Sequence, residues 1–218
     1  MKTSNIIILS TIGIIISLNF WMAVDGGNKF KNVVNQDIET TEENTIIETK
    51  LNKFSHIVVA ENIHLNLKSS RESTKLSASS KSYSKKIVGD TLYLSGDAYL
   101  TLKCDSIKSI ELKDESKLNT KQFESAYLFI KTFDNTKVFL HNVNISKLEI
   151  YSQNNSRIIL TQSEIDTTNI LASENSRIGL VGSLDVVRGE VKDNSNLSVT
   201  GANNTQFSKS GNAKINLH

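Results

Sequence analysis

The sequence predicts an all-β fold, a parallel β-helix (β-solenoid) with about 20 residues per rung, which follows an N-terminal hydrophobic helix and a flexible linker. A five-residue signature recurs at this period through the C-terminal half, and apolar residues alternate with polar ones from Phe54 onward. Asparagine fills the second position of most copies. Fixed periods of this length are typical of solenoids, propellers and arrays, and alternation is typical of half-buried strands.

Residues 1–24 are the first predicted segment, a signal peptide or a membrane anchor. Residues 6–24 are almost continuously apolar, which fits the h-region of a signal peptide or a helix of about 20 residues that spans a membrane. Trp21 and its bulky neighbours stand where a cleavage site would need small residues, whereas Lys29 and Lys31 weaken the case for a stable anchor. Both alternatives stay open, and both predict export to the periplasm or the cell surface.

Residues 25–53 are predicted to be a flexible polar linker, because they are rich in acidic residues and show no sustained helical stripe. The solenoid domain is predicted to cover residues 54–218. It opens with the alternation of Ile57 and Val59 and continues through the repeats. The boundary therefore rests on the place where the period-2 pattern begins.

The repeated signature sets the period of the solenoid. Its copies begin at 114, 134, 154, 174, 193 and 211, so the spacings are 20, 20, 20, 19 and 18 residues. The fifth position is aliphatic in every copy: Leu118, Val138, Ile158, Ile178, Leu197 and Ile215. We expect this column to point inward and to stack from rung to rung, so that the rungs stabilise one another.

The second position of the signature predicts a ladder of turn residues. It holds Asn135, Asn155, Asn175, Asn194 and Asn212. Asparagine tolerates the left-handed backbone conformation that a tight corner needs, and its amide can bond the backbone. Stacked asparagines can also bond one another along the axis, as in cross-β ladders.

The fourth position is cationic in four consecutive copies. It holds Lys117, Lys137, Arg157 and Arg177, is interrupted by Asn196 and resumes at Lys214. Each cation precedes an inward aliphatic residue, so we expect the four side chains to form an outward stripe with one charge per rung. Two interpretations stay open: a site for an acidic polymer such as an envelope polysaccharide, or a solvated ladder whose repulsion is eased by nearby acidic residues such as Asp114, Asp134 and Glu174.

Composition excludes several classes of function. The net charge of +2 is too small to indicate a nucleic-acid partner. Cys104 is the only cysteine, so the sequence contains no disulfide and no cysteine cluster for a metal, and apolar neighbours predict a buried thiol. The histidines are scattered, and no nucleophile motif or phosphate loop occurs. We therefore expect no cofactor, no metal and no catalytic site.

The main alternative is a β-helical enzyme that processes polysaccharides, a lyase or a glycosidase. Asp114 and Asp134 open consecutive copies of the signature, which would bring their carboxylates to about 5 Å, near the separation of a retaining glycosidase pair. However, Asn154 interrupts this column, and aspartate is an ordinary first residue of a turn. The sequence favours the turn role.

The order of features in residues 54–218 resembles the head GIN domain family of bacterial auto-transporter adhesins. The residues that carry the resemblance are the opening Phe54, Ile57 and Val59, the Gly89-Asp90-Thr91-Leu92 turn and strand, and the rungs that follow. It implies a right-handed parallel β-helix and an exported, non-enzymatic head with an adhesive role. The sequence departs from the family by using asparagine where members tend to use glycine.

Together these observations predict an exported, non-catalytic β-solenoid that acts as an adhesin-like binding or structural module at the bacterial cell envelope. Its expected partners are an envelope polysaccharide or another surface protein, with the N-terminal segment directed to the membrane. The last strand, near Lys214 and Leu217, is also expected to offer an open edge through which copies could associate.

Overall fold

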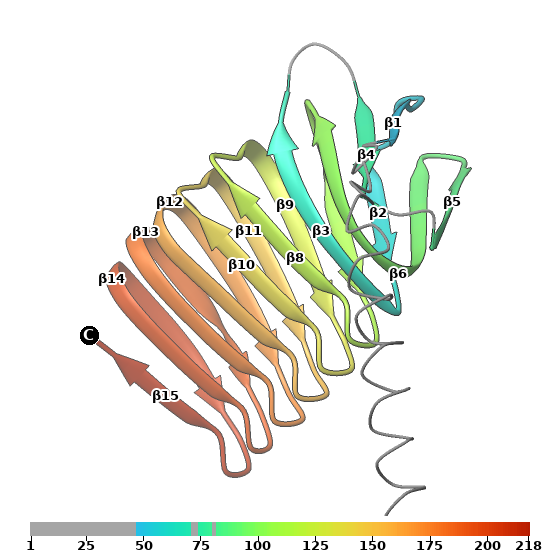
Figure 1. The fold of residues 1–218 in the computed structure, drawn as a ribbon. Helices are drawn as coiled ribbons and strands as arrows, with labels where there is room; N and C mark the ends of the chain where they lie inside the picture. Colours follow the sequence, from blue (N-terminus) through green and yellow to red (C-terminus); the bar gives the residue numbers. More distant parts are fainter. Residues whose placement is uncertain (1–46, 71–73, 80–81) are drawn as a thin grey trace, which may run out of the picture. The chain divides into compact units, whose positions relative to one another are not determined.

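The strand β12 (Arg157–Ala172) shows how the alternating pattern builds the fold. Ile158, Leu160, Ile165 and Ile170 are buried together with Ser163 and Thr168, whereas the other residues between Ile158 and Ile170 are partly or fully exposed. Period-2 alternation places one set of side chains on each face of a strand, so an apolar set collects on one side. The computed structural model describes residues 47–70, 74–79 and 82–218, and the described residues contain strands and no helix (Figure 1).

Strands of successive rungs pair in parallel on two faces of the molecule. The predicted β-solenoid is therefore confirmed. The first face holds β3 (Asn62–Ser69), β8 (Lys117–Lys121), β10 (Lys137–His141), the N-terminal parts of β12, β13 (Arg177–Val191) and β14 (Asn196–Lys209), and β15 (Lys214–Leu217). The second face holds β2 (His56–Val59), β7 (Ser109–Leu112), β9 (Glu124–Thr132), β11 (Asn144–Ser152) and the C-terminal parts of β12, β13 and β14. β6 (Thr91–Cys104) contributes to both faces.

The spatial order of the rungs differs from the chain order at the N-terminal end. β6 pairs with β2 and β3, and these two strands pair in turn with β7 and β8. The earlier rung, β2 and β3, therefore lies between the rung of β6 and the rung of β7 and β8. A simple progression along the axis, as the repeats suggest, begins only after this point.

Antiparallel strands cover the free side of β6. β4 (Lys75–Ala78) and β5 (Tyr83–Val88) both pair with it in the antiparallel sense, and β1 (Ile47–Lys50) pairs with β4. A covered edge cannot template further pairing. Strand β1 falls within residues 25–53, for which a flexible linker is predicted, because its pairing with β4 orders a segment too short and polar to show a strand pattern. Residues 25–46 of that linker and the predicted hydrophobic helix of residues 1–24 lie outside the described residues.

The core lies between the two faces. The predicted inward column is buried from Leu118 to Leu197, each residue being at most 2% exposed, and Ile215 of the last strand is partly buried. A second buried column, Ile110, Ile130, Ile150 and Ile170, comes from the second face, where the strand register places each residue opposite the next. Aliphatic stacking of this kind links each rung to its neighbours.

Hydroxyl groups fill the core beside the turns. Thr136, Ser156, Ser176 and Ser195 are fully buried. The Thr136 hydroxyl donates to Ser156 Oγ at 3.1 Å, and Ser156 donates to the carbonyl of Gln153 at 2.6 Å. Buried hydroxyl groups need such partners, so this column explains why the third position is serine or threonine in every copy of the signature before the last, which has Ala213.

Within the described residues, no helix is long and apolar enough to cross a membrane. β15 pairs with β14, and it stands at the end of the strand order. The association of copies through this edge stays a prediction.

Candidate binding surface on the first face

The strand register brings the four predicted cations into one row. Lys137 lies opposite Lys117 on one side and Arg157 on the other, and Arg157 lies opposite Arg177. All four point away from the core, because the residue that follows each of them is buried. We call these four residues the basic column. Neighbouring strands are about 4.8 Å apart, so the column presents a closely spaced row of positive charge.

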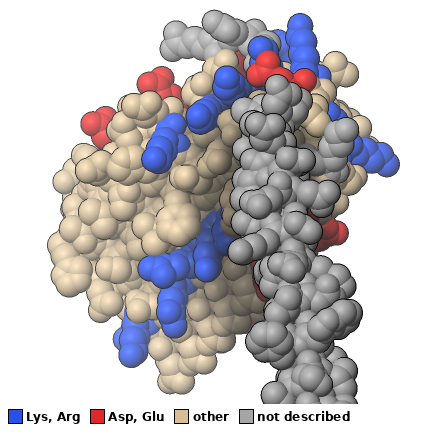
Figure 2. Space-filling view, in the orientation of Figure 1, with Lys and Arg blue, Asp and Glu red and all other residues tan. Residues whose placement is uncertain are grey.

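The basic column is electrostatically uncompensated at close range. Lys137, Arg157 and Arg177 are exposed. Among the described residues, no carboxylate lies within 4.0 Å of any of the four cations, although other lysines do form ion pairs. Figure 2 shows Lys and Arg side chains gathered on this face, and the Asp and Glu side chains in view lie at its rim. The acidic residues expected to ease the repulsion, Asp114, Asp134 and Glu174, form no ion pair with the column.

The row of cations is interrupted at Asn196, as the sequence predicts. Asn196 lies opposite Arg177 in the strand register, and Lys214 lies opposite Asn196. The Asn196 side chain is partly buried, and its Oδ1 has no hydrogen-bond partner within the described part of the chain. The cationic row therefore spans β8 to β13 without interruption.

His64 extends the column at the other end. It lies opposite Lys117, whose Nζ donates to His64 Nε2 at 2.9 Å. Burial lowers the pKa of His64 from its ordinary value of 6.5, and the charge of Lys117 lowers it further. A neutral imidazole is the form that can accept this bond. The sequence did not single out His64 as a candidate, although its outward position between the buried Ile63 and Leu65 could have indicated one.

Aromatic side chains flank this end of the column. Tyr99 packs edge-on against His64 with ring centroids 4.4 Å apart, and Tyr99 is 62% exposed. Phe139 of β10 is 39% exposed. These residues and Lys117 line a shallow hollow of about 460 Å³. An aromatic surface beside a row of cations can contact both the apolar faces and the anionic groups of a ligand.

The acidic residues of the signature serve the turns. Asp114 Oδ2 accepts the backbone N–H of Glu61 at 3.1 Å, and Asp134 Oδ1 accepts the Asn154 side-chain N–H at 3.0 Å. Each carboxylate thus binds a polar group of the neighbouring turn. These contacts fit the turn role that the sequence favours over a glycosidase pair.

The predicted asparagine ladder divides into two kinds of turn. Three members have positive φ: Asn135 at 63°, Asn155 at 59° and Asn175 at 65°. The residue before each of these three asparagines also has a positive φ, between 52° and 55°. In the last two turns only that first residue is left-handed, Asp193 at 57° and Gly211 at 61°. A left-handed first residue is therefore common to these turns, and a left-handed asparagine follows it only in the turns of Asn135, Asn155 and Asn175.

Bonds between ladder side chains are fewer than the cross-β analogy suggests. Asn212 Nδ2 donates to Asn194 Oδ1 at 3.2 Å, and the described residues show no other bond between ladder amides. The earlier turns use the backbone: the N–H of Asn135 donates to the carbonyl of Asn154 at 2.9 Å. Two consecutive left-handed residues turn the peptide groups toward the next rung, which makes these backbone bonds possible.

Other reactive groups are held in structural positions. Cys104 ends β6 and is 2% exposed, and burial together with the nearby Asp105 raises the pKa of its thiol to about 12. A protonated thiol is a poor nucleophile. In the described ranges 47–70, 74–79 and 82–218, no group of three or more His, Cys, Asp or Glu side chains is placed to hold a metal ion.

Comparison with known proteins supports the fold. No protein-family profile and no curated protein matches the sequence. Among solved structures, the chain is similar to a putative lipid binding protein from Parabacteroides distasonis ATCC 8503, with a TM-score of 0.62 and 13% identity over 79% of this chain and 96% of that one. It is also similar to a putative adhesin from Bacteroides fragilis NCTC 9343, with a TM-score of 0.54 and 15% identity over 79% of this chain and 96% of that one.

Proposed function

We propose that this chain is an exported, non-catalytic binding module of the bacterial cell envelope, and that the basic column binds an acidic polysaccharide. The single observation that carries the proposal is the column itself: Lys117, Lys137, Arg157 and Arg177 stand on adjacent strands with no carboxylate within 4.0 Å in the described residues. A structural ladder would be more stable with acidic neighbours, because like charges at this spacing repel one another.

The envelope location is part of the proposal. The apolar residues 6–24 support export, with either cleavage or retention as an anchor. The resemblance to head GIN domains and the fold shared with a putative adhesin support an adhesive role rather than a catalytic one. The putative lipid binding neighbour gives less support to a lipid ligand here, because the hollow on the first face is shallow and carries charged side chains.

The proposal is tested by titrating the purified full chain with alginate, a polymer with a carboxylate on each sugar, using calorimetry. We expect saturable binding that weakens as salt is added, since exposed charges are screened. The double variant Arg157→Gln, Arg177→Gln should bind about two- to thirtyfold more weakly, because each exposed ion pair contributes about 0.2 to 1 kcal/mol.

The matched control is Lys131→Gln, Lys147→Gln, which removes the same charge from outward positions on the second face. It should leave alginate binding unchanged. Equal weakening by the two double variants would mean that net charge alone attracts the polymer. Absence of alginate binding, or full binding by the arginine variant, would remove the basic column from consideration.

A further inference from the structure

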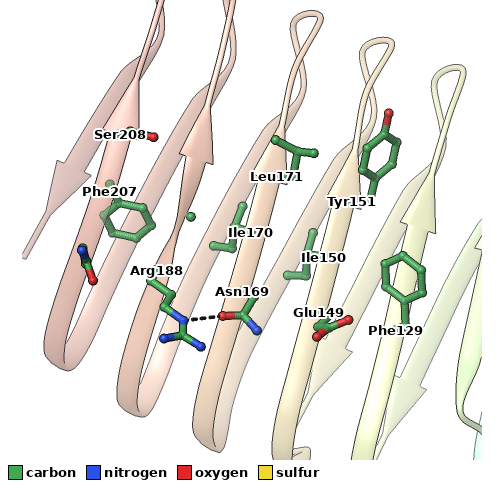
Figure 3. Close-up of a pocket in the computed structure, with 12 residues that line it drawn as sticks. Phe129, Glu149, Ile150, Tyr151, Asn169, Ile170, Leu171, Arg188, Phe207 and Ser208 are labelled. Carbon is green, nitrogen blue, oxygen red and sulfur yellow. Dashed lines mark hydrogen bonds between the residues drawn. The ribbon is translucent and has the colours of Figure 1, made fainter.

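The outer side of the second face carries a groove that none of the predicted site residues lines. Its volume is about 610 Å³. Figure 3 shows its side chains in two rows that cross neighbouring strands, with Glu149, Asn169 and Arg188 in one row and Tyr151 and Leu171 in the other. The register agrees, because Asn169 lies opposite both Glu149 and Arg188, and Tyr151 lies opposite Leu171. We call this feature the second-face groove.

The row of Glu149, Asn169 and Arg188, which we call the polar row, is held in place by hydrogen bonds. Tyr127 Oη donates to Glu149 at 2.8 Å, and Lys147 Nζ lies 2.7 Å from the same carboxylate. These two bonds hold the pKa of Glu149 below its usual range, so it stays ionised. Arg188 Nε donates to Asn169 Oδ1 at 2.7 Å. Within the described residues this is the bond that orients the guanidinium, and its terminal nitrogens remain available as donors.

The row of Tyr151 and Leu171, which we call the apolar row, is also supported by residues outside the groove. The Tyr151 ring packs against Phe133 with centroids 5.7 Å apart, and the ammonium of Lys131 lies 5.9 Å from its centroid. Leu171 and Tyr151 are both half-buried. Side chains fixed by neighbours lose little freedom when a ligand binds, which favours affinity.

Gly189 allows β12 and β13 to lie close together at the floor of the groove. It lies opposite Ile170 in the register, and a Cβ added at Gly189 would stand 2.0 Å from the carbonyl oxygen of Ile170. Any side chain would therefore push the two strands apart at the middle of the groove. Glycine lets the two rows keep the strand spacing where they face each other.

We propose that the second-face groove binds a neutral, hydroxyl-rich polysaccharide chain that lies across the strands. Carboxylate, amide and guanidinium groups together accept from and donate to hydroxyl groups, and Tyr151 and Leu171 offer an apolar surface to the C–H faces of a sugar ring. Polar groups recur along the groove once per strand, at about 4.8 Å. A polymer with a short repeating unit can use such a row, unlike a compact small molecule.

Charge and shape distinguish this ligand from other classes. Among the described residues, Glu149 and Arg188 are the charged ones that line the groove, and their opposite charges leave the lining with no net positive charge to attract a polyanion. An extended peptide would pair with a strand edge, whereas this groove lies on a sheet face. The inference is independent of the basic column, which lies on the first face.

The test uses the full chain on an array that carries dextran, laminarin and yeast mannan as neutral probes and alginate as the acidic probe. We expect at least one neutral probe to be retained saturably. Asn169→Ala and Tyr151→Ala should each weaken that binding about tenfold, through the loss of a hydrogen-bonding group or of ring contact. Thermal unfolding of each variant checks that the fold is intact.

The matched control is Thr167→Ala. Thr167 belongs to the same strand β12, lies two residues before Asn169 and does not line the groove, so this variant should bind as the parent does. The Arg157→Gln, Arg177→Gln variant should also keep neutral binding, which separates this inference from the proposed function. Retention of no neutral probe, equal weakening by Thr167→Ala, or groove-dependent retention of alginate alone would overturn the proposal.

Discussion

His64 links the protonation state of one side chain to the start of the basic column. Its Nε2 accepts a hydrogen bond from Lys117, and protonation would replace that acceptor with a donor and a second positive charge. Burial and the charge of Lys117 both lower the pKa of His64. The neutral form is therefore the one that the folded protein favours.

The pH dependence follows from the sign of this shift. The pKa of His64 is lower in the folded chain than its ordinary value of 6.5, so its contribution to stability is fully present above that value and is lost as pH falls through the lowered pKa. We expect the melting temperature of His64→Gln to fall less between about pH 7.5 and pH 5 than that of the parent, as differential scanning calorimetry would record.

A second histidine variant serves as the control for this measurement. His141 lies on the same face, in β10, and its Nδ1 is bonded to the hydroxyl of Thr161 at 3.0 Å. His141→Gln removes an imidazole from the first face without touching Lys117. If His64→Gln and the parent lose the same melting temperature on acidification, His64 does not control the acid sensitivity of the fold.

At the scale of the strands, the shortening of the repeat from 20 to 19 and 18 residues has a definite location. The register of β12 with β13 runs from Thr161 opposite Val181 directly to Ser163 opposite Gly182, so one residue is skipped at the corner between the two faces. The register of β13 with β14 is shifted at the same corner. The shorter repeats therefore lose their residues at this corner, and the turns and the buried columns keep their alignment.

Glycine at this corner is a requirement that can be measured. A Cβ on Gly182 would lie 2.2 Å from the backbone oxygen of Ser163, whereas a Cβ on Gly179 of the same strand meets nothing within 4 Å. We expect Gly182→Ala to lower the free energy of unfolding by about 1 to 3 kcal/mol, because a rigid backbone neighbour must move. Urea denaturation measures the change.

Gly179→Ala is the matched control for that variant. It makes the same chemical change three residues earlier in β13, where the added methyl group has open space. It should be neutral or slightly stabilising, because alanine reduces the freedom of the unfolded chain. Equal destabilisation by the two variants would show that the corner has no special need for glycine.

At the scale of the whole described unit, the order of the rungs makes the N-terminal strands essential. β2 and β3 lie between β6 and the pair β7 and β8, so they form pairing partners on both sides. They also bring Ile57 and Leu65 into the core. The repeats that begin at β8 therefore depend on strands that carry no copy of the signature.

Truncation tests this dependence. A fragment of residues 47–218 keeps every described strand and should unfold cooperatively in thermal melts followed by circular dichroism. A fragment of residues 109–218 lacks β2 and β3, which leaves the edges of β7 and β8 unpaired and the core open. We expect it to aggregate or to remain unfolded. A cooperative melt of the shorter fragment at the same temperature would contradict the interlocked arrangement.

The repeats made much of the fold and of the basic column predictable. Alternation along one strand is a local property, and a period of 20 residues repeats the same environment at Lys117, Lys137, Arg157 and Arg177. Column membership and inward or outward direction therefore follow from sequence alone. The alignment of Glu149 with Asn169 on the second face could also have been predicted, because these two residues share that spacing. The sequence does not indicate, however, which side chains these polar residues contact.

The sequence by itself thus determined the solenoid class, the buried columns and the alignment of the cations, because these depend on intervals along the chain. The tertiary structure decided what depends on contacts between segments far apart. These are the place of β2 and β3 beside β6, the ion pairs of the described residues, none of which includes the basic column, and the groove across β9 to β14. Such contacts arise from competition among distant partners, and no local pattern records which partner wins.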